Sequence, residues 1–146
     1  MADSSSFEAL NPYQMCDKAA VVMEGKALKP ARKAFLLAIM AGVFIGLGFV
    51  YCAIANVTGA GKIVGGLVFS LGLMLVVVLG ADLFTSTTMT LIPRASGKIS
   101  WGQMFSNWGV VYAGNFVGSI FLVVLILLSG HPWENGGSIA IFYINT

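Results

Sequence analysis

A cluster of polar side chains lies within an otherwise apolar part of the chain. The segment GADLFTSTTMTLIP, Gly80 to Pro93, contains Asp82 and four consecutive hydroxyl residues, Thr85, Ser86, Thr87 and Thr88. Hydroxyl groups and free backbone N–H groups bind anions, whereas an ionised carboxylate repels them. The cluster therefore predicts a pathway or site for a small polar solute, in which Asp82 needs a separate role.

The composition places this cluster in a membrane protein. Hydrophobic residues make up 58% of the 146 residues and charged residues only 10%, which is outside the range of a soluble domain. The first 33 residues hold four of the six acidic and five of the eight basic residues. We expect residues 1–33 to belong to the mature protein, because they lack the apolar core and cleavage site of a secretory signal. Their basic residues predict a cytoplasmic segment.

Three apolar stretches are long enough to cross a hydrocarbon core of about 30 Å. They cover about residues 34–55, 63–93 and 107–129, and together they define a three-span membrane half-domain at 34–129. Residues 130–146 follow as an external loop and C-terminal tail. The predicted fold is an all-α integral membrane protein.

The second span is too long to be one straight helix. As a continuous helix, the 31 residues of 63–93 would measure about 46 Å, well beyond a core of about 30 Å. Irregular backbone at membrane depth occurs only where it is buried in protein or lines a cavity. We therefore predict a break at the polar cluster, with a second half-helix that starts near Ser86 and presents its positive dipole end to anions.

Asp82 has two interpretations. As a loop cap, its carboxylate would accept hydrogen bonds from the backbone N–H groups that follow it. As a proton relay or cation ligand, it would make the protein a cation carrier. We favour the loop cap, because the spans contain no second acidic or basic residue to pair with Asp82.

The distribution of basic residues predicts the orientation. Lys62 is alone on one side of the membrane, and seven basic residues lie on the other: Lys18, Lys26, Lys29, Arg32, Lys33, Arg94 and Lys98. The positive-inside bias places the N-terminus and the RASGKIS loop in the cytoplasm. This bias explains the surplus of basic residues without nucleic acid as a partner.

The N-terminal segment NPYQMCDKAAVVMEGKA reads as an amphipathic helix. Asn11 is its expected N-cap and Pro12 its first residue. The expected apolar face consists of Met15, Ala19, Val22 and Met23. The helix is either a movable cover at a cytoplasmic pore mouth or a static helix lying in the lipid headgroups.

The remaining features concern packing and exclude several classes of function. Gly42 with Gly46, and Gly114 with Gly118, have the small-xxx-small spacing of closely packed membrane helices. Cys16 and Cys52 are expected on opposite sides of the membrane and therefore unpaired. The sequence has no metal-ligand spacing, nucleotide loop or activated nucleophile, so we expect neither a cofactor nor an enzyme.

Four motifs carry a resemblance to a known family. VVLGADLFTS, KIVGGLVFSLGL, ASGKISWGQM and YAGNFVGSIF together resemble the N-terminal half of the formate/nitrite transporter family, in particular its bacterial formate channels. The resemblance implies a homopentamer of aquaporin-like protomers in the lipid bilayer of the bacterial inner membrane. Each protomer would conduct formate or another small monovalent anion; nitrite and hydrosulfide members share much of this core.

The resemblance also assigns roles to individual residues. Phe69 and Leu73 would line apolar constrictions of the pathway. Leu83, Phe84 and Thr85 would form a mobile pore loop, in which the Thr85 hydroxyl contacts the anion. The N-terminal helix lies at the cytoplasmic mouth in this family, which favours a gating role for it.

Members of the family are about twice as long, with a second, inverted set of three spans. That half would supply a second broken helix, a central pore histidine, and a lysine and an asparagine that attract anions. His131 is in the outer loop and does not replace the pore histidine. We expect a truncated channel or a half that needs its complement; the alternative is a non-transporting scaffold or regulatory subunit that binds a full-length relative.

Overall fold

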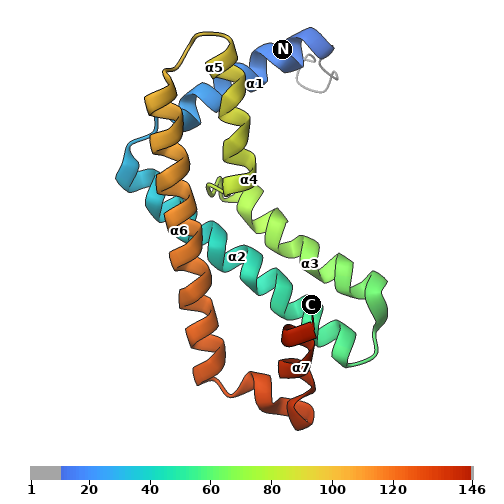
Figure 1. Cartoon of the computed structure of the whole chain (residues 1–146). Helices are drawn as coiled ribbons and strands as arrows, with labels where there is room; N and C mark the ends of the chain where they lie inside the picture. Colours follow the sequence, from blue (N-terminus) through green and yellow to red (C-terminus); the bar gives the residue numbers. More distant parts are fainter. Residues whose placement is uncertain (1–10, 146) are drawn as a thin grey trace, which may run out of the picture.

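The computed structural model describes residues 11–145, without the side chains of residues 134 and 135. All regular elements in this part of the chain are helices (Figure 1). Three helices are long and apolar enough to cross a membrane: α2 (Ala31–Val57), α3 (Gly61–Val78) and α6 (Trp101–Leu128). The predicted all-α class and three spans are confirmed. The third helix begins six residues earlier than expected, because Ser100 and Gln103 form a capping box ahead of the apolar stretch.

Helix α2 is the centre of the bundle, because both α3 and α6 pack against it (Figure 1). Glycines make these contacts close. A Cβ atom on Gly118 would lie 2.1 Å from the Ile39 carbonyl oxygen, and one on Gly42 would lie 2.3 Å from the Asn115 carbonyl oxygen. The small-xxx-small prediction for α2 and α6 is therefore confirmed. Gly48 and Gly72 make a further close contact between α2 and α3, where a Cβ atom on Gly72 would lie 2.6 Å from the Phe44 carbonyl oxygen.

The second span is broken, as the length argument predicts. Helix α3 ends at Val78, and the backbone turns at Gly80, whose φ of 63° suits glycine. Residues 81–83 are not helical, after which the chain continues as α4 (Phe84–Thr87), the 3-10 turn η2 (Thr88–Thr90) and α5 (Leu91–Ala95). The helix restarts at Phe84, ahead of the expected Ser86, because the Leu83 carbonyl already accepts the N–H groups of the first turn.

Helix α1 (Pro12–Ala27) crosses the end of the bundle and packs against α5, η2 and α4 (Figure 1). The predicted N-cap is confirmed, because Asn11 and Gln14 form a capping box. The predicted apolar face is partly wrong. Met15 and Val22 are 55% and 48% exposed, whereas Ala20 and Ala27 are buried. Small side chains on this face allow the backbone of α1 to approach the segment after the break.

The chain after the third span is more regular than the expected loop and tail. The 3-10 segment η3 (His131–Gly137) leads into α7 (Ser138–Asn145), which folds back against α2 (Figure 1). The Phe49 ring of α2 lies 6.4 Å from the ring of Phe142 and 5.7 Å from that of Tyr143. Aromatic contacts at these distances fix the position of α7.

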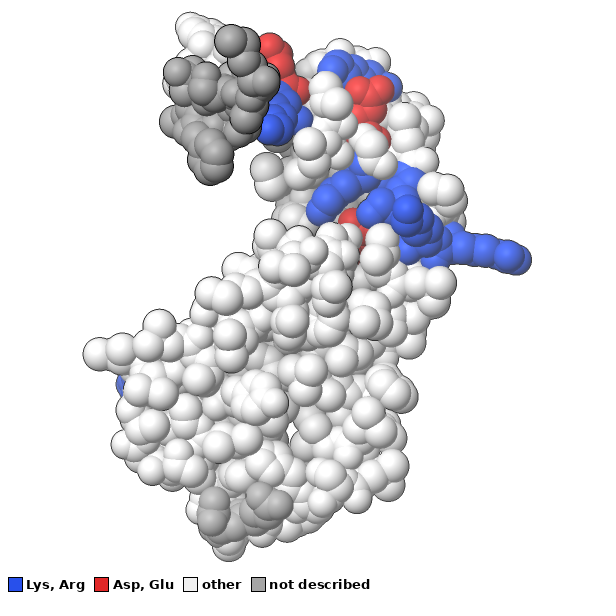
Figure 2. Space-filling model, turned by 180° about the vertical axis from the view of Figure 1, so that it is seen from behind, with Lys and Arg blue, Asp and Glu red and all other residues white. Residues whose placement is uncertain are grey.

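Charged side chains gather at one end of the molecule. Figure 2 shows most lysine and arginine side chains over the end that carries α1 and α5, and a long uncharged surface below them. Glu24 on α1 forms an ion pair of 3.8 Å with Lys98, beyond α5. The charged residues are thus concentrated outside the three apolar spans, as the composition predicts.

The two cysteines are free thiols. Cys16 is exposed and Cys52 is half-buried.

A substitution at the α2–α6 contact should destabilise the fold. Gly118→Leu must displace the backbone of Ile39, so we expect a loss of about 3 kcal/mol, the upper end of typical overpacking. Unfolding in mixed detergent micelles measures the loss. Gly109→Leu on the same helix is the control, because a Cβ there has no neighbour within 4 Å. Equal stability of the two variants would contradict the close contact.

Candidate functional site

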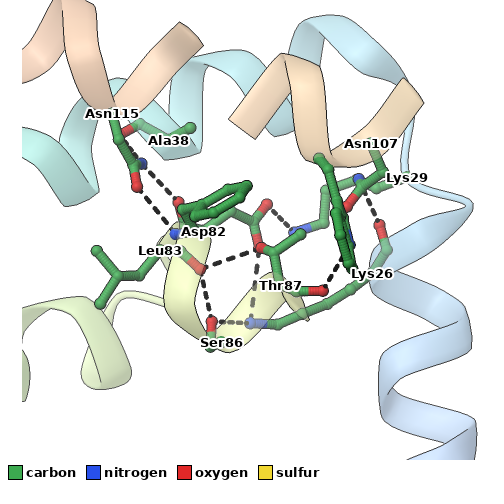
Figure 3. Close-up of polar contacts among 11 residues, drawn as sticks. Lys26, Lys29, Ala38, Asp82, Leu83, Ser86, Thr87, Asn107 and Asn115 are labelled. Carbon is green, nitrogen blue, oxygen red and sulfur yellow. Dashed lines mark hydrogen bonds and ion pairs between the residues drawn. The ribbon is translucent and has the colours of Figure 1, made fainter. Parts of the chain in front are cut away.

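The break between α3 and α4 holds a buried charge. Asp82 is 3% exposed, and its carboxylate contacts two lysines from the end of α1 and the segment that follows it (Figure 3). Lys29 donates a hydrogen bond to Asp82 Oδ2, and Lys26 Nζ lies 3.8 Å from Oδ1. The two ammonium groups compensate the carboxylate, which makes a charge at this depth tolerable.

The predicted role of Asp82 as a loop cap is wrong. Within residues 11–145 its carboxylate accepts no hydrogen bond from backbone N–H, and the start of α4 has no cap from a neighbouring side chain. The predicted spans themselves contain no basic residue that could pair with Asp82. The partners lie 53 and 56 residues away in sequence, in the N-terminal segment, and two ammonium groups compete successfully with backbone amides for the carboxylate.

Asn115 of α6 takes the place of the predicted cap. Its Oδ1 accepts the Phe84 N–H at 2.9 Å, and its Nδ2 donates to the carbonyl oxygens of Ala38 at 2.8 Å and Asp82 at 2.9 Å (Figure 3). Asn115 was not among the residues expected at the site. The available signal was an amide side chain within an apolar span, which is rare and marks a specific partner.

Lys26 ties α1 to two further elements. Its ammonium donates to the Ser86 hydroxyl at 3.3 Å, and its carbonyl oxygen accepts a 3.2 Å hydrogen bond from Asn107 of α6 (Figure 3). Asn107 is 7% exposed, so this contact is also shielded from solvent. The end of α1 is therefore fixed to the break, to α4 and to α6 by polar contacts.

Most hydroxyls of the polar cluster are used locally. Ser86 and Thr87 donate to the Leu83 carbonyl oxygen, and Thr88 donates to that of Thr85. The Trp108 indole N–H donates to Thr90 Oγ1 at 2.9 Å and to the Thr87 carbonyl oxygen at 3.2 Å. These hydroxyls therefore satisfy their own helix, as such groups often do in membrane spans.

Thr85 differs from its neighbours. Its side chain is exposed, and in the described part of the chain neither its hydroxyl nor its N–H donates a hydrogen bond. The other N–H groups of the first turn of α4 are occupied: that of Phe84 by Asn115, and those of Ser86 and Thr87 by the Leu83 carbonyl. Of the N–H groups predicted to be free at the start of the second half-helix, only that of Thr85 is free among the described residues of the first turn.

Apolar residues assigned to the pathway lie on both sides of the break. Phe69 and Leu73 are one turn apart on α3 and 38% and 49% exposed. Leu83 packs against the cluster of Ala41, Val76 and Ala81. The Phe84 ring contacts those of Trp108 at 6.2 Å and Tyr112 at 5.5 Å, edge to face. Their lining role stays a prediction.

The described residues contain no group of three His, Cys, Asp or Glu side chains that could hold a metal ion. The polar groups at the break are the Asp82 carboxylate, which is neutralised by two lysines, the Asn115 amide with its three hydrogen bonds, and the hydroxyl and N–H donors of Thr85. Such an arrangement can bind and release an anion.

The chain is similar to known anion channels. The family model for formate/nitrite transporters matches residues 13–143. The formate channel FocA of Escherichia coli K12 is 46% identical over 144 residues, which cover 94% of this chain and 50% of the relative. The nitrite transporter NirC of Salmonella typhimurium is 36% identical over 101 residues, covering 66% of this chain and 36% of NirC.

A solved structure is also similar. A pentameric formate channel with formate bound has a TM-score of 0.69 and 48% sequence identity over 77% of this chain and 46% of the channel chain. The present chain spans about half the length of the curated relatives it matches. The family match, the identity to formate channels and the broken second span show that the chain belongs to the formate/nitrite transporter family.

Proposed function

We propose that this chain forms half of a pathway for formate or a similar small monovalent anion across the bacterial inner membrane. The observation that carries the proposal is Thr85, whose exposed hydroxyl and N–H are both unoccupied at the break. An anion that leaves water needs such donors to replace its hydration. The bound formate of the similar pentameric channel supports the choice of substrate. Nitrite and hydrosulfide have the same charge and remain alternatives.

Apolar residues before and at the break complete the proposed pathway. Phe69 and Leu73 on α3, with Leu83 and Phe84 at the break, would form narrow apolar sections along the same pathway as the Thr85 donors. Apolar constrictions exclude hydrated ions unless a polar site compensates for the lost water. The combination favours transport of a small solute over catalysis, because it brings no acid, base or nucleophile to the solute.

Assembly with further chains is part of the proposal. Helix α3 buries only a narrow stripe of Gly65, Gly72 and Val76, and most of its large apolar side chains are exposed. A pathway beside α3 needs a protein wall on the far side, from another copy or from a second three-span half. The pentameric state of the similar channel supports a homo-oligomer.

We further propose that α1 is a gate at the cytoplasmic mouth. The excess of basic residues at the α1 end supports a cytoplasmic position. The contacts of Lys26 and Lys29 with Asp82 and Ser86 link α1 directly to the loop that carries Thr85. Movement of α1 would break a buried ion pair, so the position of α1 and the conformation of the loop are coupled.

The alternatives differ in their use of the break. A cation carrier would need Asp82 free for a cation, but two lysines already compensate this carboxylate. A scaffold that binds a full-length relative would use the exposed faces of the helices and leave Thr85 without a role. The two tests below separate these functions from an anion pathway.

Replacement of Thr85 tests the pathway. Thr85→Val removes the hydroxyl and keeps the shape, so formate flux should fall about ten- to hundredfold, the effect of losing a hydrogen bond to a charged group. Flux is measured in liposomes with the chain alone and with the second half of a full-length relative. Thr88→Val is the control, because the Thr88 hydroxyl is bonded to its own helix. Unchanged flux in Thr85→Val would favour the scaffold.

Replacement of Asp82 tests the link to α1. Asp82→Asn leaves Lys26 and Lys29 without their buried partner, so α1 should detach from the loop. A spin label on the exposed Cys16, in a Cys52→Ser background, reports the mobility of α1.

We expect a clearly more mobile label in Asp82→Asn and little change in Glu24→Gln, which removes only the exposed pair with Lys98. An immobile label in both variants would argue against the gate. Loss of a cation-coupled uptake in Asp82→Asn would instead support the cation carrier.

A further inference from the structure

We infer that Asn115 is a positioning residue that sets the conformation of the pore loop and restricts anion contact to Thr85. The inference rests on the proposed anion pathway and adds a determinant of its specificity. Within residues 11–145 the Asn115 side chain forms no hydrogen bond with Thr85, so its effect is exerted through Phe84 and Asp82.

The side-chain amide of Asn115 forms three hydrogen bonds, each to a different segment of the chain. The acceptor Oδ1 binds the N–H of Phe84 at the start of α4, one Nδ2 hydrogen binds the carbonyl of Asp82 in the break, and the other binds the carbonyl of Ala38 in α2 (Figure 3). These bonds measure 2.8 to 2.9 Å, close to ideal. One amide therefore satisfies the break and the start of α4 and ties both to the central helix.

Helix packing fixes the backbone from which this amide projects. The carbonyl oxygen of Asn115 faces Gly42, where a Cβ would lie only 2.3 Å away, and the flanking Gly114 and Gly118 meet α2 at Phe35 and Ile39. Close contacts of α2 and α6 thus lie at Asn115 itself and within one turn of it. The position of the loop is consequently set by the contact between two spans, and not by the loop sequence alone.

The amide also decides which donors are left for an anion. If Phe84 N–H were free, the start of α4 would offer two adjacent backbone donors and attract anions with less discrimination. With Asn115 in place, the N–H of Phe84 is occupied and the two donors of Thr85 remain. An aspartate at this position could still accept from Phe84, but it would lose both donated bonds and place a negative charge beside the pathway.

Two variants and one control test the inference. Asn115→Ala removes all three bonds, Asn115→Asp keeps only the accepted one, and Ser119→Ala removes a nearby hydroxyl whose partner is the Asn115 carbonyl of the same helix. Amide hydrogen exchange of the complete chain in lipid nanodiscs reports the loop without requiring transport. We expect exchange at Phe84 to rise about tenfold or more in Asn115→Ala and to stay close to the wild-type rate in Ser119→Ala. Asn115→Asp should give a smaller rise, because it keeps the bond to Phe84 but turns a carboxylate oxygen toward the carbonyl oxygens of Ala38 and Asp82.

The pattern of exchange separates positioning from general stability. Faster exchange confined to residues 80–87 supports the inference, whereas a proportional increase throughout α2 and α6 would overturn it and leave Asn115 with a merely structural role. An unchanged Phe84 rate in Asn115→Ala would also overturn it. Because this readout involves no flux, a failure of the proposed pathway would not affect the result.

Specificity is the second readout, in liposomes that also contain the second half of a full-length relative. Asn115→Ala should lower the preference for formate over chloride several-fold while flux persists, because Phe84 N–H becomes an additional donor. Asn115→Asp should lower the flux of both anions through charge repulsion. Equal preference in wild type and Asn115→Ala would contradict the specificity role, even if the loop exchanges faster.

Discussion

The need to satisfy the buried backbone polar groups at the break governs this structure. Hydrocarbon offers no hydrogen bonds, so the interrupted helix between α3 and α4 is stable only where other protein groups replace the lost ladder. Asn115 supplies these groups for Phe84 and Asp82, and the lysines of the N-terminal segment neutralise the Asp82 side chain. The N-terminal segment, α2 and α6, which are distant in sequence, therefore meet at the loop between α3 and α4.

Close helix contacts make this convergence possible. The glycines of α2 and α6 bring the two backbones together, which places the Asn115 amide within reach of both α2 and the break. Interhelical hydrogen bonds in membranes are modest individually, and close packing supplies much of the association energy. The packing of the spans and the conformation of the polar loop are thus parts of one structural unit.

The same structural unit holds the polar loop in place around Thr85. Helix α1 is tied to the break by Lys26, and the Trp108 indole binds the segment that leads away from the break. Thr85 lies between these fixed points and keeps its donors free. A rigid frame with one unoccupied polar residue suits weak, reversible binding, which conduction requires.

Several features were determined by the sequence alone. Composition and span length gave the class, the three spans and the break, because hydrocarbon thickness and helix rise are fixed quantities. The motifs gave the family, and glycine spacing gave the close contacts of α2 and α6.

Only the tertiary structure decided how the polar residues are partnered. Asp82 pairs with lysines more than 50 residues away, and Asn115 performs the capping that local sequence assigned to Asp82. It also showed that Ser86, Thr87 and Thr88 are satisfied by their own backbone, leaving Thr85 free. Hydrogen bonds depend on distances within a few tenths of an ångström, and these are set by helix packing that periodicity does not specify.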